Sequence, residues 1–268
     1  MLAPLVVGVA LSSLAPTAAT QSAPAEVTRL TPITVTATRV PTPGFDVPAA
    51  ISVITRDQIR QGPPGASLAQ TLARVPGLVA QNRQSYAQDL QLSLRGFGAR
   101  ASFGVRGIRL LMDGLPLSLP DGQGETDPFD LAIAQRIEVL RGPFSTLYGN
   151  AAGGVIQVFT ENGPARPTVG AHLMLGSYGT RVERFQGGGT AGAFNYIANF
   201  SRFATDGYRD HSAAEREHLY TKLRYTPSEN TKLTFLFNAE NQPYAEDPSG
   251  LTAEQVAENP RQAVPAVY

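Results

Sequence analysis

The sequence predicts an α+β domain followed by antiparallel strands that cross a membrane as part of a β-barrel. Short strand and helix patterns, separated by Gly and Pro, fill residues 47–163. After Pro167 the pattern changes to long segments that are apolar on one face and polar on the other. Short and long connections alternate between most of these segments, which is typical of strands in an outer membrane.

The composition argues against several classes of protein. Its 22 basic and 22 acidic residues balance, so the chain lacks the basic surface of a nucleic-acid-binding protein. It contains no Cys, which excludes disulfide scaffolds, thiolate metal sites and Cys nucleophiles. Because neither paired carboxylates nor a nucleophile–base motif is recognisable, we expect no enzyme activity and no cofactor.

The first 46 residues divide into two segments. Residues 1–19 resemble a signal peptide, with an apolar run from Leu2 to Leu14 and small residues up to Ala19. That run is too short for a membrane helix, which needs about 20 residues, and a disordered Ala/Pro-rich tail is the alternative. Residues 20–46 are a Pro- and Thr-rich linker. Within it, residues 33–38 (ITVTAT) alternate like a strand that awaits a partner edge, or are simply a β-prone linker.

The α+β domain begins with a strand at Ala50–Ile54, followed by Thr55 as the N-cap of a short helix. Ser67 caps a second helix over residues 68–74, which ends at Val75-Pro76-Gly77. A strand over residues 91–95 follows. Residues 108–117 then predict a hairpin around an Asp113-Gly114 turn.

The domain ends with two strands, at residues 137–141 and 155–159, joined by a loop of small residues. Glycines give this loop and its strand ends backbone freedom, and they are Gly142, Gly149, Gly153 and Gly154. Arg95, Glu138 and Arg141 stand near the Gly-rich ends of strands. Charges in a packed element need polar partners, so we expect an enclosing polar surface around them.

Five candidate strands follow, over residues 168–176, 180–189, 193–204, 217–227 and 231–241. In the fourth, Leu219 and Leu223 share one face while Lys222 and Arg224 share the other. A soluble sandwich also alternates, but its strands are usually about 5–6 residues long. Segments of about 9–11 residues match strands that cross an outer membrane.

The chain resembles the TonB-dependent outer-membrane receptors in five segments that keep the family's order. These are ITVTAT (33–38), SLAQTLARVPGLV (67–79), LSLRGFGAR (92–100), IRLLMDGLPL (108–117) and IEVLRGPFSTLYGNAAGGVIQVFT (137–160). The resemblance implies an α+β plug domain (47–163) followed by the first antiparallel strands of a large outer-membrane β-barrel (168–268). Such barrels have about 22 strands, so the barrel is incomplete here and the chain is expected to be an N-terminal fragment.

The resemblance also implies roles for particular residues. The TonB box would be Ile33, Thr34, Val35, Thr36, Ala37 and Thr38, and it would pair with the energy-transducing TonB protein of the TonB–ExbB–ExbD system. Plug structure and gating would depend on Arg95, Gly96, Glu138, Arg141, Gly142, Gly149, Gly153 and Gly154, with the three charges facing the inner wall of the barrel. Candidate ligand contacts are Arg100, Phe103, Asp121 and Gln123, and no metal site is expected.

The implied function is energy-coupled uptake of a scarce small-molecule ligand, such as an iron–siderophore complex, across the outer membrane of a Gram-negative bacterium. Residues 75–127 are closest to a subgroup that includes the receptor for pyrroloquinoline quinone, so this non-iron cofactor is an alternative ligand. A non-functional truncated receptor is another alternative. A signalling transducer would carry a further domain between Ala19 and Ile33, and a passive pore would need neither plug nor box.

Overall fold

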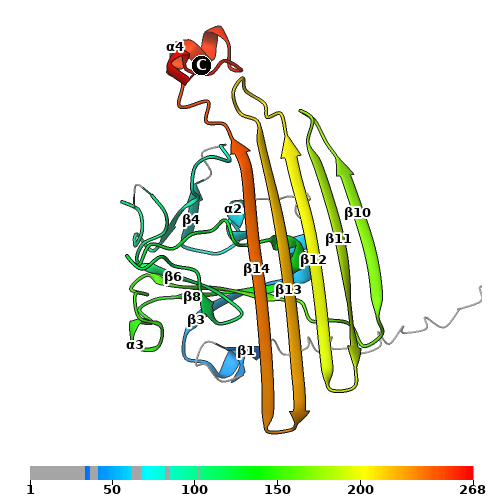
Figure 1. Ribbon diagram of the computed structural model, residues 1–268. Helices are drawn as coiled ribbons and strands as arrows, with labels where there is room; N and C mark the ends of the chain where they lie inside the picture. The colour runs from blue at the N-terminus through cyan, green and yellow to red at the C-terminus, as the bar shows by residue number, and fades with distance from the viewer. Residues whose placement is uncertain (1–33, 37–41, 62–67, 82–84, 102, 268) are drawn as a thin grey trace, which may run out of the picture. The chain divides into compact units, whose positions relative to one another are not determined.

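The computed structural model describes residues 34–36, 42–61, 68–81, 85–101 and 103–267 (Figure 1). The predicted signal segment, the box residues Ile33, Ala37 and Thr38, and the predicted helix cap Ser67 lie outside the described residues. Two five-stranded sheets carry the architecture. We call residues 42–160 the plug and the sheet within residues 168–245 the wall.

The plug sheet has the strand order β3-β8-β9-β6-β7. The pair β6–β9 is parallel and the other pairs are antiparallel. The strand bounds are β3 (Ala50–Thr55), β8 (Ala134–Arg141), β9 (Gly154–Thr160), β6 (Ile108–Met112) and β7 (Leu115–Pro116). Strand β9 is the middle strand of the sheet and β8 lies beside it, and most residues of both strands are buried.

Local sequence signals account for two features of the plug. Thr55 precedes helix α1 (Arg56–Arg60), and its N–H donates to Gln58 Oε1 at 2.9 Å, as expected of a helix start. Asp113 and Gly114 both have positive φ, 48° and 87°, and join β6 to β7 in the predicted hairpin. Asp tolerates this conformation and Gly adopts it without strain.

Smaller elements complete the described chain. They are β1 (Thr34–Val35), β2 (Thr42–Pro43), α2 (Leu68–Leu72), β4 (Leu78–Gln81), β5 (Gln91–Leu94), α3 (Ser145–Tyr148), α4 (Ala253–Glu258) and 3-10 turns at Gly44–Asp46, Leu131–Ile133 and Pro265–Val267. Two differ from the sequence-based expectation. Residues 78–81, which were not predicted as a strand, pair with β5, and the predicted small-residue loop contains α3.

The wall is an antiparallel meander in the order β10-β11-β12-β13-β14. Its strands are β10 (Thr168–Leu175), β11 (Arg181–Ala191), β12 (Phe194–Thr205), β13 (Ala214–Ser228) and β14 (Thr231–Ala245). All five predicted strands are present, but β13 and β14 reach 15 residues each and exceed the predicted length. Within the described residues, β10 and β14 each pair with one strand only, so the sheet is unclosed.

The two faces of the wall differ in character. Large apolar side chains alternate along the outward face and stay exposed, among them Val169 (93%), Phe235 (61%) and Leu219 (44%). The inward face is polar and buried by the plug, and it includes Asn199, Ser201, His218 and Lys222. This alternation with a period of two confirms the predicted amphipathic strands and the predicted fold class.

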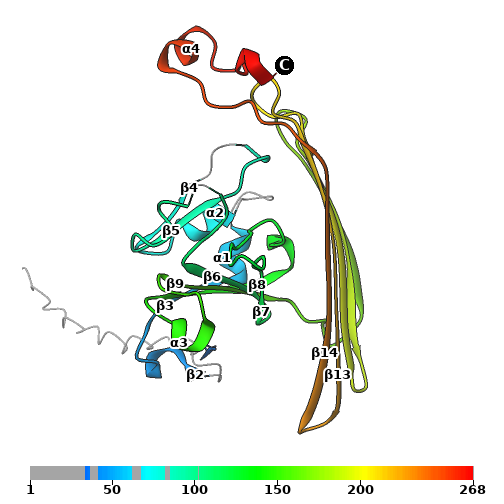
Figure 2. The same cartoon turned by 60° about the vertical axis from the view of Figure 1, so that its left-hand side comes forward.

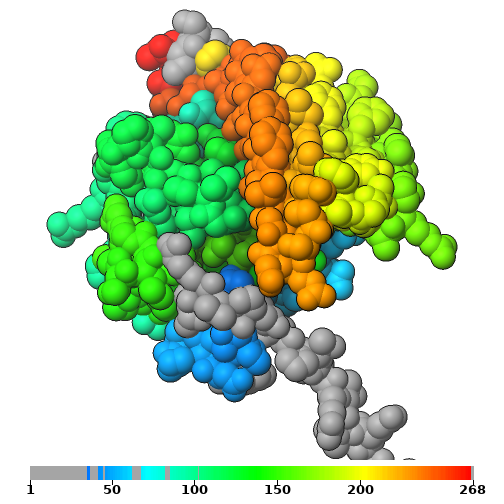
Figure 3. All heavy atoms as spheres, turned by 60° about the horizontal axis from the view of Figure 1, so that its bottom comes forward, coloured from blue at the N-terminus to red at the C-terminus, as the bar shows by residue number. Residues whose placement is uncertain are grey.

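The plug packs against the inward face of the wall, which Figure 2 shows in profile and Figure 3 as touching spheres. Ile197 of β12 and Tyr220 of β13 belong to the same buried apolar cluster as Ile137 and Ile156 of the plug sheet. Polar contacts surround this cluster, for example from Ser201 Oγ to Asp130 Oδ2 at 2.8 Å. In the described part of the chain, no helix is long and apolar enough to cross a membrane.

Candidate functional site

The N-terminal segment Thr34–Thr36 lies on the plug, and its first two residues form the short strand β1 (Thr34–Val35). Thr34 and Val35 of β1 pair with Pro43 and Thr42 of β2. Proline has no N–H, so half of this pairing lacks a donor on the β2 side. Val35 is only 1% exposed, because it packs in an apolar cluster with Leu140 of β8 and other plug residues.

Glu138 is the main polar partner of this segment. Its Oε2 accepts hydrogen bonds from Thr36 N at 3.0 Å and from Thr36 Oγ1 at 3.1 Å. Its Oε1 accepts from Arg136 Nε at 2.8 Å, and Tyr148 donates to the Thr36 carbonyl at 3.3 Å. Glu138 is fully buried, so its carboxylate needs these polar partners. The site can therefore hold one extended strand by a charged acceptor and one apolar contact.

The charges predicted to face the barrel wall instead make their described contacts with the plug and with the N-terminal segment. Glu138 binds Thr36 and Arg136, and Arg141 Nη1 donates to the Pro76 carbonyl at 3.2 Å. Arg95 is exposed, and its backbone N–H donates to the Gly77 carbonyl at 2.9 Å. Glu138 finds its polar partners on its own strand and on the N-terminal segment, and Arg141 finds one in the loop after α2.

The backbone explains the glycines near these charges. Gly96, Gly142, Gly149 and Gly154 all have positive φ, between 76° and 150°. A Cβ at Gly154 would also collide with the Leu140 carbonyl, and one at Gly153 would collide with Phe97. Around Gly149 and Gly96 there is open space, so only the backbone conformation favours glycine there.

The predicted ligand residues are brought together in part. Arg106 Nη2 pairs with Asp121 Oδ2 at 2.8 Å and donates to Gln123 Oε1 at 3.2 Å. The Gln123 backbone N–H donates to Asp121 Oδ1 at 3.0 Å. This backbone bond and then Arg106 hold the pKa of Asp121 below its usual 3.8, so its carboxylate stays ionised at neutral pH. Loops 98–106 and 118–126 are therefore tied together by a polar cluster on the plug surface.

The other two predicted ligand residues stand apart from that cluster. Phe103 is 73% exposed, and the following residue, Gly104, donates its N–H to Asp89 Oδ2 at 3.0 Å. Arg100 is exposed, and within the described residues it makes no hydrogen bond or ion pair. The exposed Phe103 ring can stack on a planar ligand, and the Arg100 guanidinium can bind an anionic one.

Several residues that position these groups were not found from the sequence. Arg136 and Glu138 are two apart on a strand and so share a face, which is a usable signal. Arg106 and Tyr148 carry no such signal, because their partners come from distant segments. Among the described residues, no group of three or more His, Asp or Glu could hold a metal ion.

The chain is similar in sequence to a known receptor domain and to a known receptor. Residues 43–155 match the family model described as the TonB-dependent receptor plug domain. The ferric enterobactin receptor of Pseudomonas aeruginosa is 32% identical in an alignment 130 residues long, which covers 43% of this chain and 17% of that protein. The chain thus spans about a sixth of that curated relative.

Solved structures of receptors share the fold. The pyoverdine outer-membrane receptor FpvA of Pseudomonas aeruginosa matches with a TM-score of 0.65 and 19% identity, over 78% of this chain and 30% of that one. The ferric yersiniabactin uptake receptor FyuA of Yersinia pestis matches with a TM-score of 0.59 and 23% identity, over 72% of this chain and 31% of that one. At these identities the matches concern the fold alone.

Proposed function

From a chain that carries a TonB-dependent receptor plug domain joined to antiparallel strands, we propose the energy-coupled uptake of a scarce ligand across an outer membrane. The protein that contains this sequence would bind the ligand outside and release it into the periplasm of a Gram-negative bacterium. The observation that carries the proposal is the joining of a plug domain to a sheet with an exposed apolar outer face.

The wall supports a position in lipid. Its outward side chains are apolar and exposed, and a soluble sheet would bury such a face. The inward face carries Asn, Ser, His and Lys side chains that meet the plug. We propose that this outward face contacts the hydrocarbon of an outer membrane.

The N-terminal segment supports coupling to an energy source. Residues 33–38 would pair as an added strand with the TonB protein of a TonB–ExbB–ExbD system. Thr34 and Val35 are already extended, and their pairing with β2 is short. Few hydrogen bonds must therefore break before a partner can take this strand.

The proposed ligand is an iron–siderophore complex. The relatives named above are receptors for ferric enterobactin, pyoverdine and ferric yersiniabactin. On the plug, Arg100 and Phe103 are exposed and would contact the ligand, and the separate Arg106–Asp121–Gln123 cluster holds two neighbouring loops together. Pyrroloquinoline quinone, planar and rich in carboxylates, fits the same pair of groups and is the second candidate.

An uptake assay tests the proposal. Cells that express the gene containing this sequence would be offered radioactive iron complexed to different siderophores, or pyrroloquinoline quinone, with and without deletion of residues 33–38. We expect accumulation of one ligand class, abolished by the deletion while surface binding persists. Uptake that continues unchanged after the deletion contradicts energy coupling, and uptake of the quinone alone replaces the iron assignment.

A further inference from the structure

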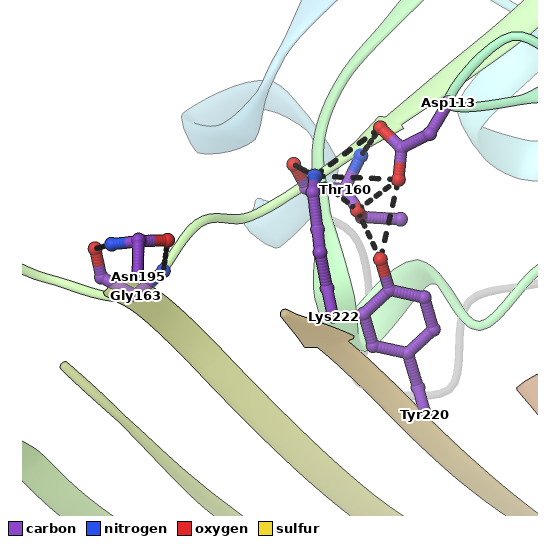
Figure 4. A network of polar contacts seen from close by, with 6 residues as sticks. All are labelled: Asp113, Thr160, Gly163, Asn195, Tyr220 and Lys222. Atoms are coloured by element: carbon purple, nitrogen blue, oxygen red, sulfur yellow. Dashed lines mark hydrogen bonds and ion pairs between the residues drawn. The ribbon is translucent and has the colours of Figure 1, made fainter. Parts of the chain in front are cut away.

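A buried polar cluster joins the plug to wall strand β13 at the end of β9 (Figure 4). Its members are Asp113 of the β6–β7 turn, Thr160 of β9, and Tyr220 and Lys222 of β13. The side chains of Asp113 and Lys222 are 11% and 5% exposed, and Tyr220 is fully buried. The proposed uptake function assigns no role to these groups.

Every polar group of the cluster has a partner. The Asp113 carboxylate accepts from Thr160 N at 3.1 Å, from Tyr220 Oη at 3.2 Å and from the Thr160 hydroxyl. Lys222 Nζ donates to Thr160 Oγ1 at 2.9 Å and to the Thr160 carbonyl at 3.3 Å, and it lies 3.4 Å from both Asp113 oxygens. A buried ion pair whose groups are all hydrogen-bonded is costly to separate, because removal of one partner leaves an unpaired buried charge.

Glu161 and Gly163, which follow Thr160, also make hydrogen bonds to the wall. Glu161 is buried, accepts from Gln186 of β11 at 3.2 Å, and pairs with Arg56 and Arg60 of α1. Gly163 N–H donates to Asn195 Oδ1 of β12 at 3.0 Å, and Asn195 Nδ2 donates back to the Gly163 carbonyl at 2.7 Å. Contacts to three wall strands therefore follow one another within four residues.

The N-terminal segment is held differently. There β1 makes two residue pairs with β2, one of them with a proline, and two hydrogen bonds join Thr36 to Glu138. All of these partners belong to the plug and none to the wall strands. Force applied at residues 33–38 therefore meets a short strand first and reaches β9 through Glu138 and the neighbouring strand β8.

We propose that Asp113, Thr160, Tyr220 and Lys222, with the bonds of Glu161 and Gly163, form a permanent anchor that keeps the end of β9 on the wall during uptake. Ligand passage then requires movement of other parts of the plug, not its departure as one body. The transport part of this proposal rests on the proposed function, whereas the anchor is a property of the fold and can be tested without transport.

Hydrogen exchange in outer-membrane vesicles tests the anchor itself. The chain has two lysines, so Lys232→Met, at an exposed position of the same sheet, is the matched control for Lys222→Met. We expect Lys222→Met to speed exchange of the β9 and β6 amides about tenfold or more, with no change in Lys232→Met. Asp113→Asn combined with Lys222→Met should recover part of the protection, because it removes the unpaired charge. Equal exchange in the two Met variants, or simply additive effects in the double variant, overturns the anchor.

A cross-link tests whether the anchor persists during uptake. Because the chain has no Cys, a reducible linker with two methanethiosulfonate ends can join Asp113→Cys to Lys222→Cys, or Thr36→Cys to Glu138→Cys. Each end forms a disulfide with one cysteine and releases methanesulfinate. We expect uptake by the first cross-linked protein to stay within about twofold of its reduced form, and uptake by the second to fall at least about tenfold until the linker is cleaved. Loss of uptake on cross-linking the first pair overturns the proposal. Absence of uptake by the unsubstituted protein rejects the proposed function, and hydrogen exchange then decides on the anchor.

Discussion

Replacing Glu138 by Ala should release the N-terminal segment from the plug. Two hydrogen bonds from Thr36 end on the Glu138 carboxylate, at 3.0 and 3.1 Å. Both are lost in the variant, while the burial of Val35 is kept. Arg136 also loses its partner, but it does so whether the segment is docked or released. The loss of the Arg136 contact therefore does not change the free-energy difference between the docked and the released segment.

The size of the effect follows from the two bonds. A hydrogen bond to a charged group contributes about 1.5–3 kcal/mol, and these two share one oxygen atom, so their joint loss is about 2–3 kcal/mol. Each 1.4 kcal/mol is a factor of ten, so the released fraction should rise roughly 30- to 150-fold.

Thiol labelling measures this released fraction. Val35 is 1% exposed and the chain has no Cys, so Val35→Cys is a single thiol that reacts only after release. Its maleimide labelling rate would be compared with and without Glu138→Ala, and with Glu229→Ala in the exposed turn after β13 as the control. A labelling rate that changes less than about threefold in the Glu138 variant refutes the docking role inferred for this carboxylate.

Three further outcomes are expected. Gly154→Ala should destabilise the plug by about 4 kcal/mol in chemical denaturation, and Gly149→Ala by only about 2 kcal/mol. Both substitutions strain the backbone, but only a Cβ at Gly154 also collides with its neighbours. Equal losses of unfolding free energy in the two variants would contradict this difference. The Gln123 backbone amide and the Arg106 guanidinium lower the pKa of Asp121. The Asp121–Arg106 contact should therefore persist at neutral pH and be lost only as the pH falls below 3.8. A carboxyl titration by NMR with a midpoint at or above 3.8 counts against it. On the outward face, Phe237→Arg should destabilise the protein in lipid by about 2–4 kcal/mol, whereas the inward Thr234→Arg should cost less than about 1 kcal/mol. Similar losses at the two sites argue against lipid contact.

Much of the fold could be predicted because its signals are local. The two-residue alternation after Pro167 gave all five wall strands, and the Asp113-Gly114 turn gave the β6–β7 hairpin. Strand ends were less predictable. β13 and β14 continue to 15 residues through polar positions, because pairing with a neighbour rather than side-chain pattern sets where they end.

The sites were harder to predict because their partners are distant in sequence. Glu138 was found as a charge that needs a partner, but its partner Thr36 lies 102 residues away. Asp113 was assigned only to a turn, although its carboxylate meets Lys222, 109 residues further on. The pattern around a residue reports its secondary structure, whereas these contacts depend on how the plug packs on the wall.

Dependence of uptake on the inner-membrane energy source tests the central claim most directly. Cells would be loaded with a radioactive iron–siderophore complex with and without an uncoupler that collapses the proton gradient. Surface binding and accumulation would be counted separately. The account predicts that binding persists and that accumulation stops in the presence of the uncoupler. Accumulation that continues at the same rate without the gradient contradicts energy-coupled uptake.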